Sequence, residues 1–130
     1  MKLLEWTEIF LNYRKAMGLI VDFQKQNNQF IVKKKNQVTK FFVFDDLQEL
    51  NIKSEDISEG DSVVTLNTKQ NLDFLIKNWD FFLDKNLTVL FVNPKVNEKW
   101  SVNTKTHSFV TDRKNIAKSL KALFEGVQEV

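Results

Sequence analysis

The sequence predicts an α/β (α+β) fold in which three helices flank one mixed β-sheet. Apolar residues recur at helical spacing near both ends of the chain, and short β-rich runs fill the middle. A further helical segment separates two of these runs, as in a strand–helix–strand unit. With 130 residues, of which 42% are hydrophobic, the chain can build one core but not two. We therefore expect one globular domain over residues 1–130.

The first helix is expected over residues 3–18, because Trp6, Phe10 and Tyr13 follow one another at three- and four-residue spacing. Gly18 is a suitable end for this helix. Three short strands are then expected at 20–23, 30–32 and 41–44. Polar, turn-forming residues separate them, so the short links favour an antiparallel meander.

Residues 45–61 are strongly acidic, with seven Asp and Glu side chains against Lys53 alone. We interpret this segment as a long surface connection with one helical turn near residues 47–50. A domain boundary is disfavoured, because neither flank is long enough to fold separately.

The second half of the chain predicts a βαβ unit. A strand at 62–66 precedes a helix that is capped by Asn67 or Thr68 and extends to about Lys85. The apolar run 87–92 is typical of a strand buried on both faces in a parallel pairing.

Beyond Pro94, residues 99–103 and 108–111 are weaker strand candidates. Asp112 is expected to cap a last helix, whose apolar stripe includes Ile116 and Leu120. The predicted order is α-β-β-β-β-α-β-β-α.

A helix, a three-strand meander, a helix and a strand in this order resemble the core of the restriction-endonuclease-like superfamily. The resemblance implies an acid near the second core strand and an acid-x-Lys on the third, which hold a divalent metal and orient water. Here the second strand reads Phe30-Ile31-Val32-Lys33-Lys34, and Val38 stands two residues before Lys40. The catalytic motif is absent, so the resemblance implies a nuclease-like domain that does not cleave through a metal at that position.

Composition excludes several classes of protein. Nineteen basic residues against 17 acidic ones give a net charge of +2, far from that of a protein that coats nucleic acid. No cysteine and one histidine exclude disulfides, thiolate zinc sites and multi-histidine metal sites within one chain. No apolar run is long enough to span a membrane, and no secretory signal is visible. We expect a cytoplasmic protein with no cofactor and no membrane partner.

Two groups of polar residues are weighed as catalytic candidates. Asp45 and Asp46 follow a strand and could hold magnesium if Asp112 joined them, but a turn and a helix cap explain them better. His107, Ser108 and Asp112 contain the residue types of a hydrolase triad, yet neighbours on a strand point to opposite faces and no Gly-x-Ser-x-Gly elbow exists. We therefore expect no catalytic centre.

Two lysine groups are candidate nucleic-acid contacts. Lys33, Lys34 and Lys35 lie between phenylalanines, and the last helix carries lysines opposite its apolar stripe. These helix lysines are Lys114, Lys118 and Lys121. Nucleic-acid binding depends on the two groups converging on one face, whereas solvated edges and helix faces carry lysine for ordinary reasons.

The helix expected over 68–84 is apolar on two sides. Its main stripe includes Leu72, Leu75 and Trp79, while Phe74 and Phe81 project from the opposite side. The second side must pack within the domain or against another chain, since exposing two Phe side chains forfeits about 3–6 kcal/mol.

These observations predict a non-enzymatic binding or assembly module that acts through a protein interface at Phe74 and Phe81, with a homodimer as one form. The first alternative is an inactive nuclease-like domain that binds nucleic acid through its lysines. The second is a metal-dependent hydrolase that uses Asp45, Asp46 or Asp112.

Overall fold

A computed structural model describes residues 1–50 and 56–130 of the chain. The described residues form one six-stranded mixed sheet flanked by helices, as the sequence predicts. The strands are β1 (Asp22–Gln26), β2 (Gln29–Lys33), β3 (Val38–Phe44), β4 (Ser62–Leu66), β5 (Thr88–Asn93) and β6 (Glu98–Asn103). The helices are α1 (Leu3–Ala16), α2 (Lys69–Lys77), α3 (Trp79–Asp84), α4 (Thr104–Val110) and α5 (Ile116–Glu125), with short 3-10 turns η1 (Leu47–Glu49) and η2 (Arg113–Asn115).

The strands lie side by side in their sequence order. The first three form the expected antiparallel meander. β3, β4 and β5 are parallel to one another, with Val43 opposite Val64 and Val64 opposite Leu90. β6 returns antiparallel to β5. The meander and the βαβ unit are therefore both confirmed.

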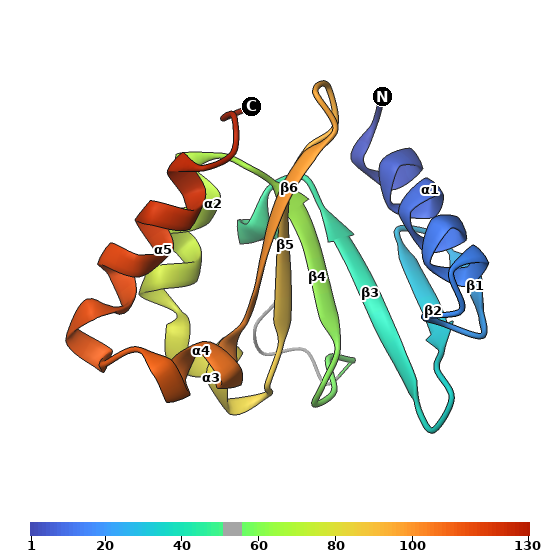
Figure 1. Cartoon of the computed structure of the whole chain (residues 1–130), viewed down its shortest axis with the longest axis horizontal. Helices are drawn as coiled ribbons and strands as arrows, with labels where there is room; N and C mark the ends of the chain where they lie inside the picture. Colours follow the sequence, from blue (N-terminus) through green and yellow to red (C-terminus); the bar gives the residue numbers. More distant parts are fainter. Residues whose placement is uncertain (51–55) are drawn as a thin grey trace.

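Helices cover the two faces of the sheet unequally. In Figure 1, α1 lies alone on one side, while α2, α3, α4 and α5 lie on the other. The core is correspondingly divided into two clusters, one on each face of the sheet.

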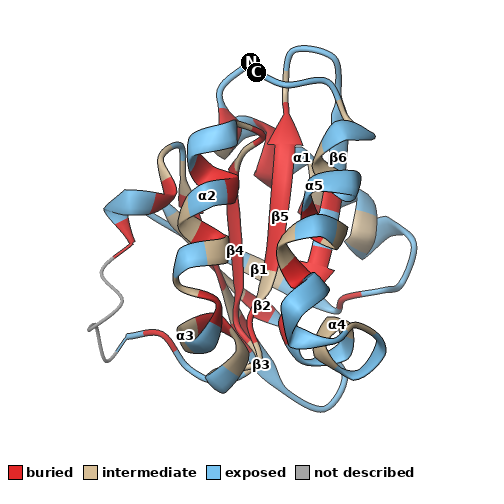
Figure 2. Ribbon diagram, turned by 90° about the vertical axis from the view of Figure 1, so that its left-hand side faces the viewer, coloured by how far each residue is buried: buried red, intermediate tan, exposed pale blue. Residues whose placement is uncertain are grey.

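The central parallel strands are buried on both faces, as the apolar run 87–92 predicts. Figure 2 shows β4 and β5 in the colour of buried residues. Val63 and Phe91 belong to the cluster beneath α2 and α5, whereas Val64 and Leu90 belong to the cluster beneath α1. Successive side chains of each strand point to opposite faces, so one short apolar strand contributes residues to both core clusters.

The acidic connection after β3 is anchored to the core, so its interpretation as a surface segment is incomplete. The turn expected near residues 47–50 is present as η1, but Leu47, Leu50 and Ile57 are buried. The buried side chain of Asn71 on α2 accepts from the backbone N–H of Leu47 at 2.8 Å and donates to the carbonyl of Asp45 at 3.0 Å. Residues 51–55, which include Glu55 of this segment, lie outside the described residues.

The predicted helix 68–85 is interrupted at Asn78, which separates α2 from α3. Thr68 caps α2 as expected, accepting from the backbone N–H of Asn71 at 3.1 Å. The side-chain amide of Asn78 donates to the carbonyl of Phe74 at 2.9 Å, a local bond that competes with helix continuation. On α3, Phe82 is fully buried and Leu83 is half-buried.

The expectation of a strand at 108–111 is wrong, because these residues follow or belong to α4. Asn103 caps α4 by accepting from the backbone N–H of Thr106 at 2.9 Å. Asp112 does not cap the last helix through its side chain; it precedes η2, and its carbonyl accepts from Asn115 at 2.8 Å. No helix in residues 1–50 and 56–130 is long and apolar enough to cross a membrane.

Candidate binding groove beside the first helix

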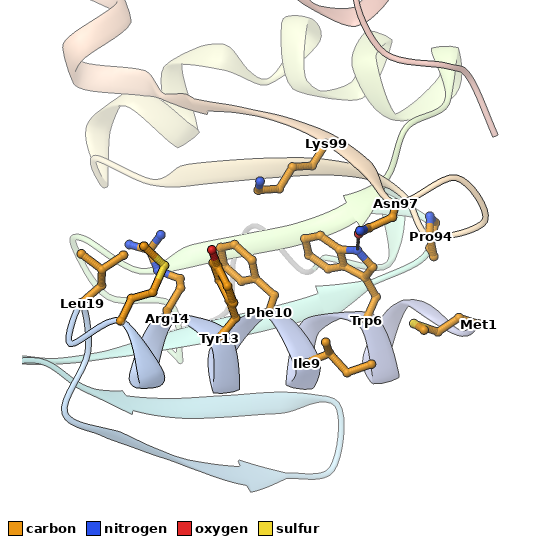
Figure 3. Close-up of a pocket in the computed structure, with 11 residues that line it drawn as sticks. Met1, Trp6, Ile9, Phe10, Tyr13, Arg14, Leu19, Pro94, Asn97 and Lys99 are labelled. Carbon is orange, nitrogen blue, oxygen red and sulfur yellow. Dashed lines mark hydrogen bonds between the residues drawn. The ribbon is translucent and has the colours of Figure 1, made fainter.

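A groove of about 650 Å³ runs beside α1, between this helix and the turn that joins β5 to β6 (Figure 3). It exists because one helix, roughly 10 Å across, cannot cover a six-stranded sheet, which is roughly 25 Å wide. α1 packs on β3 and β4. Lys99 and Ser101 of β6 remain exposed beyond it.

An aromatic column on α1 forms the floor of the groove. Trp6 and Phe10 stack with ring centroids 5.2 Å apart and an interplanar angle of 11°. Arg14 continues the column at the same four-residue spacing, with its guanidinium carbon 5.3 Å from the Phe10 centroid. From β6, the ammonium of Lys99 lies 5.5 Å from the same centroid. The negative face of the Phe10 ring therefore attracts two cations.

The opposite wall is held to α1 by a hydrogen bond. The indole Nε1 of Trp6 donates to Oδ1 of Asn97 at 2.8 Å, and Figure 3 shows this bond closing one end of the groove beside Pro94. Asn97 has a φ of 54°, a left-handed conformation that asparagine tolerates better than most residues. The turn between β5 and β6 thus positions both an acceptor and a wall.

The rim of the groove exposes large apolar side chains. Ile9, Tyr13 and Met17 are 56%, 64% and 56% exposed, and Leu19 is also exposed. All four line the groove together with Trp6 and Phe10. A contiguous apolar surface of this kind is typical of a binding site, whereas single exposed apolar residues are not.

The groove is electrostatically positive. Among the residues that the structure describes, its lining includes Arg14 and Lys99 and no Asp or Glu. Neither cation forms an ion pair within the part of the chain that the structure describes. The neighbouring Lys15, in contrast, pairs with Asp22 at 2.9 Å, and this hydrogen bond lowers the pKa of the Asp22 carboxyl.

Phe74 and Phe81, the predicted interface residues, are half-buried within the protomer. Both rings meet Phe82 edge to face, with centroids 6.4 Å and 5.5 Å away. A shallow and mostly polar hollow lies beside Phe74. Part of their apolar surface is therefore covered by the domain itself, and an interface at these two residues stays a prediction.

The two lysine groups lie far apart. Lys33, Lys34 and Lys35 belong to the end of β2 and the turn before β3, whereas Lys114, Lys118 and Lys121 belong to η2 and α5. Figure 1 shows this turn and α5 at opposite ends of the long axis. The structure thus presents two separate basic surfaces instead of the single face on which the nucleic-acid hypothesis depends.

The residues weighed as catalytic candidates have other partners. His107 Nε2 lies 2.7 Å from the Ser119 hydroxyl, and burial lowers the pKa of this imidazole. Ser108 donates to the carbonyl of Lys105 at 2.7 Å. Asp46 accepts from the backbone N–H of Gln48 at 2.9 Å, as a turn cap does. In the described ranges, no three His, Asp or Glu side chains gather in a way that could hold a metal ion.

Sequence reasoning did not identify the groove. The spacing of Trp6, Phe10 and Tyr13 predicts one apolar stripe, without separating the residues that pack on the sheet from those that face solvent. The available signal was Ile9, an apolar residue off that stripe, which makes the apolar arc of α1 wider than one buried face. Lys99 and Asn97 join the site only through the fold.

Comparison with protein-family models, with curated proteins and with solved structures gave no match. The resemblance to the restriction-endonuclease-like superfamily therefore has no support beyond the order of the elements.

Proposed function

We propose that this protein is a non-enzymatic binding module that docks a partner protein in the groove beside α1. The observation that carries the proposal is the exposed apolar rim formed by Ile9, Tyr13 and Met17 over the Trp6–Phe10 stack. A binding or assembly module is also what the sequence predicts, but we propose the interface on α1 instead of at Phe74 and Phe81.

The composition of the groove supports protein binding. Aromatic residues, methionine and arginine are enriched where proteins bind one another, and the groove contains Trp6, Phe10, Tyr13, Met17 and Arg14. The floor is rigid, because Trp6 is stacked, hydrogen-bonded and 6% exposed. A pre-formed floor lowers the cost of ordering side chains on binding.

The first test concerns the homodimer that the sequence suggested. Light scattering after size-exclusion chromatography compares the wild type with Ile9→Lys/Met17→Lys and with Phe74→Ser/Phe81→Ser up to millimolar concentration. If the wild type is a dimer that only Ile9→Lys/Met17→Lys dissociates, the occupant of the groove is a second copy of this chain. If only Phe74→Ser/Phe81→Ser dissociates the dimer, the interface lies at Phe74 and Phe81 and the proposed docking site on α1 is wrong. If the wild type is a monomer, the partner is a different protein.

The second test identifies that protein. A photo-cross-linking amino acid replaces Tyr13 in the rim, or Lys121 on α5 as the matched control on the other side of the sheet. A protein captured from Tyr13 alone is then purified, and its binding to the chain is measured by calorimetry. We expect Ile9→Lys/Met17→Lys to weaken binding by about tenfold or more for each apolar anchor, without loss of fold.

Two outcomes would contradict the proposed docking site on α1. If the wild type is monomeric and Tyr13 captures no more than Lys121, the groove is not a docking site. The same conclusion follows if the purified partner binds the Ile9→Lys/Met17→Lys variant as tightly as the wild type.

A further inference from the structure

We infer that the occupant of the groove is an amphipathic α-helix of the partner, whose apolar stripe packs on the Trp6–Phe10 floor and whose flanking Glu or Asp pairs with Arg14 and Lys99. This inference rests on the proposed function and specifies the chemistry of the partner.

A helix fits the groove better than an extended peptide does. The backbone of a bound strand must be hydrogen-bonded by its host, but β5 is already paired with β6 along its length, and of β6 only Lys99 lines the groove. Asn97, the only side-chain amide among the described lining residues, already accepts from Trp6. A helix satisfies its own backbone and needs only side-chain contacts.

The shape of the groove agrees with this occupant. Figure 3 shows the lining residues following α1 from Met1 and Pro94 at one end to Leu19 at the other. α1 has 14 residues, which corresponds to roughly 21 Å of helix. An occupant of about four turns can therefore lie alongside α1 and present one apolar residue to the rim at each turn.

The positive charge of the groove favours acidic residues beside the apolar stripe of the partner's helix. Arg14 and Lys99 converge on Phe10, and the described lining residues include no carboxylate. A carboxylate placed between them gains two partners in a partly apolar setting, where charge pairs are stronger than in water.

The same charges disfavour a second copy of this chain. A two-fold interface brings identical surfaces together, so it would place Arg14 and Lys99 of both copies near one another with no acid from the lining between them. Like charges across an interface oppose association.

The test uses three synthetic peptides of about 18 residues, or roughly five helical turns. The first carries a leucine stripe at three- and four-residue spacing flanked by Glu. The second replaces every Glu with Lys, and the third keeps Glu but places two prolines at the centre. Binding is followed by the indole N–H signals of the full-length chain in nitrogen–proton NMR spectra. Trp6 reports on the groove, while Trp79 and Trp100 lie in the other core cluster and serve as internal references.

We expect the Glu peptide to shift the Trp6 signal and to bind at least about fivefold more tightly than the Lys peptide. The proline peptide should not bind. Arg14→Glu/Lys99→Glu should reverse the preference, so that the Lys peptide binds the variant more tightly than the Glu peptide does. Lys105→Glu/Lys121→Glu, which reverses two exposed cations on α4 and α5, should leave the preference unchanged.

Several outcomes overturn the inference. These are equal binding of the Glu and Lys peptides, binding of the proline peptide, and no shift of Trp6 up to millimolar Glu peptide. If these occur while a purified partner still loses affinity for Ile9→Lys/Met17→Lys, the docking function holds and only the acidic helix is wrong.

Discussion

The indole N–H of Trp6 and the side-chain carbonyl of Asn97 meet at 2.8 Å across 91 positions of sequence. This bond joins the first helix to the turn between the last two strands. Because Trp6 also forms the floor of the groove, the same side chain closes the fold and shapes the candidate site. Stability and binding are therefore coupled at this residue.

Removing the Trp6–Asn97 bond should cost a modest amount of stability. Trp6→Phe keeps an aromatic ring but loses the donor, and Asn97→Gly loses the acceptor while a glycine suits the φ of 54°. We expect Trp6→Phe to lower the free energy of unfolding by at least about 0.5–1.5 kcal/mol, because the loss of buried indole atoms adds to the loss of the bond. Urea denaturation of both single variants and the double variant isolates the coupling between the two side chains. Strict additivity would mean that the bond contributes nothing.

Much of the sheet could be predicted from local patterns. The run 87–92 is apolar at nearly every position, and such a run has few alternatives to a strand buried on both faces. The helix at 3–18 is likewise indicated by the spacing of its apolar residues, and the turn at 47–50 by residues close to it in sequence. In these segments the local preference and the tertiary environment agree.

The structure departs from the prediction where tertiary contacts override local preference. Residues 104–110 contain Thr, Phe and Val, which favour strands, yet they form α4. The hydroxyl of Thr104 is buried and donates to the carbonyls of Phe82 and Leu87 at 2.9 Å and 3.0 Å. These long-range bonds anchor the start of the helix, and no short window of sequence reveals them.

The candidate site was less predictable than the fold. Its floor comes from one helix near the start of the chain, but Asn97 and Lys99 come from a turn and a strand much further along the sequence, with 91 positions separating Trp6 from Asn97. The periodicity of α1 identifies its apolar residues without showing how much of the arc the sheet covers. That fraction depends on the width of the sheet relative to one helix, which is a property of the assembled fold.

Two neighbouring side chains on α3, Phe82 and Leu83, should differ in their contribution to stability. Phe82 is fully buried, whereas its neighbour Leu83 is half-buried. We expect Phe82→Ala to destabilise the protein by about 3–5 kcal/mol, because it opens a cavity in the core. Leu83→Ala should cost clearly less in the same urea titration. A larger loss for Leu83→Ala would contradict the burial that the structure gives these two side chains.

Asn67 is expected to be one of the most sensitive polar positions. It is fully buried; its Oδ1 accepts from Nε1 of Trp100 at 2.7 Å, and its Nδ2 donates to the carbonyls of Val127 and Gln128 at 3.3 Å and 3.2 Å. Asn67→Ala removes the partner of the Trp100 indole and of the Val127 carbonyl, while the Gln128 carbonyl keeps its bond from Nδ2 of Asn93 at 3.1 Å. The substitution should cost about 1–3 kcal/mol. The exposed Asn12 on α1 provides the control, since Asn12→Ala should change stability by less than about 0.5 kcal/mol.

Asn67→Asp separates the two roles of this side chain. The carboxylate still accepts from Trp100, but it faces the carbonyls of Val127 and Gln128, which are acceptors too. We expect a loss of stability at neutral pH that is partly recovered on acidification, when the protonated acid can donate again. Thermal unfolding of Asn67→Asp and Asn67→Ala across the acidic range measures the difference. Parallel pH profiles for the two variants would contradict this account.

His107 should make stability depend on pH. Its imidazole is partly buried between α4 and α5, 2.7 Å from the Ser119 hydroxyl and edge to face with Trp79, and burial lowers its pKa. The unfolded chain, with a histidine pKa of about 6.5, then binds more protons than the folded chain as the pH falls below that value. Stability is therefore complete above the unfolded pKa and decreases as the pH falls through it toward the lower pKa of the folded state. His107→Gln, which can still bond Ser119, should reduce this loss between neutral and mildly acidic pH in urea titrations. If the wild type and His107→Gln lose stability equally over this interval, the pKa of His107 is not lowered in the folded state.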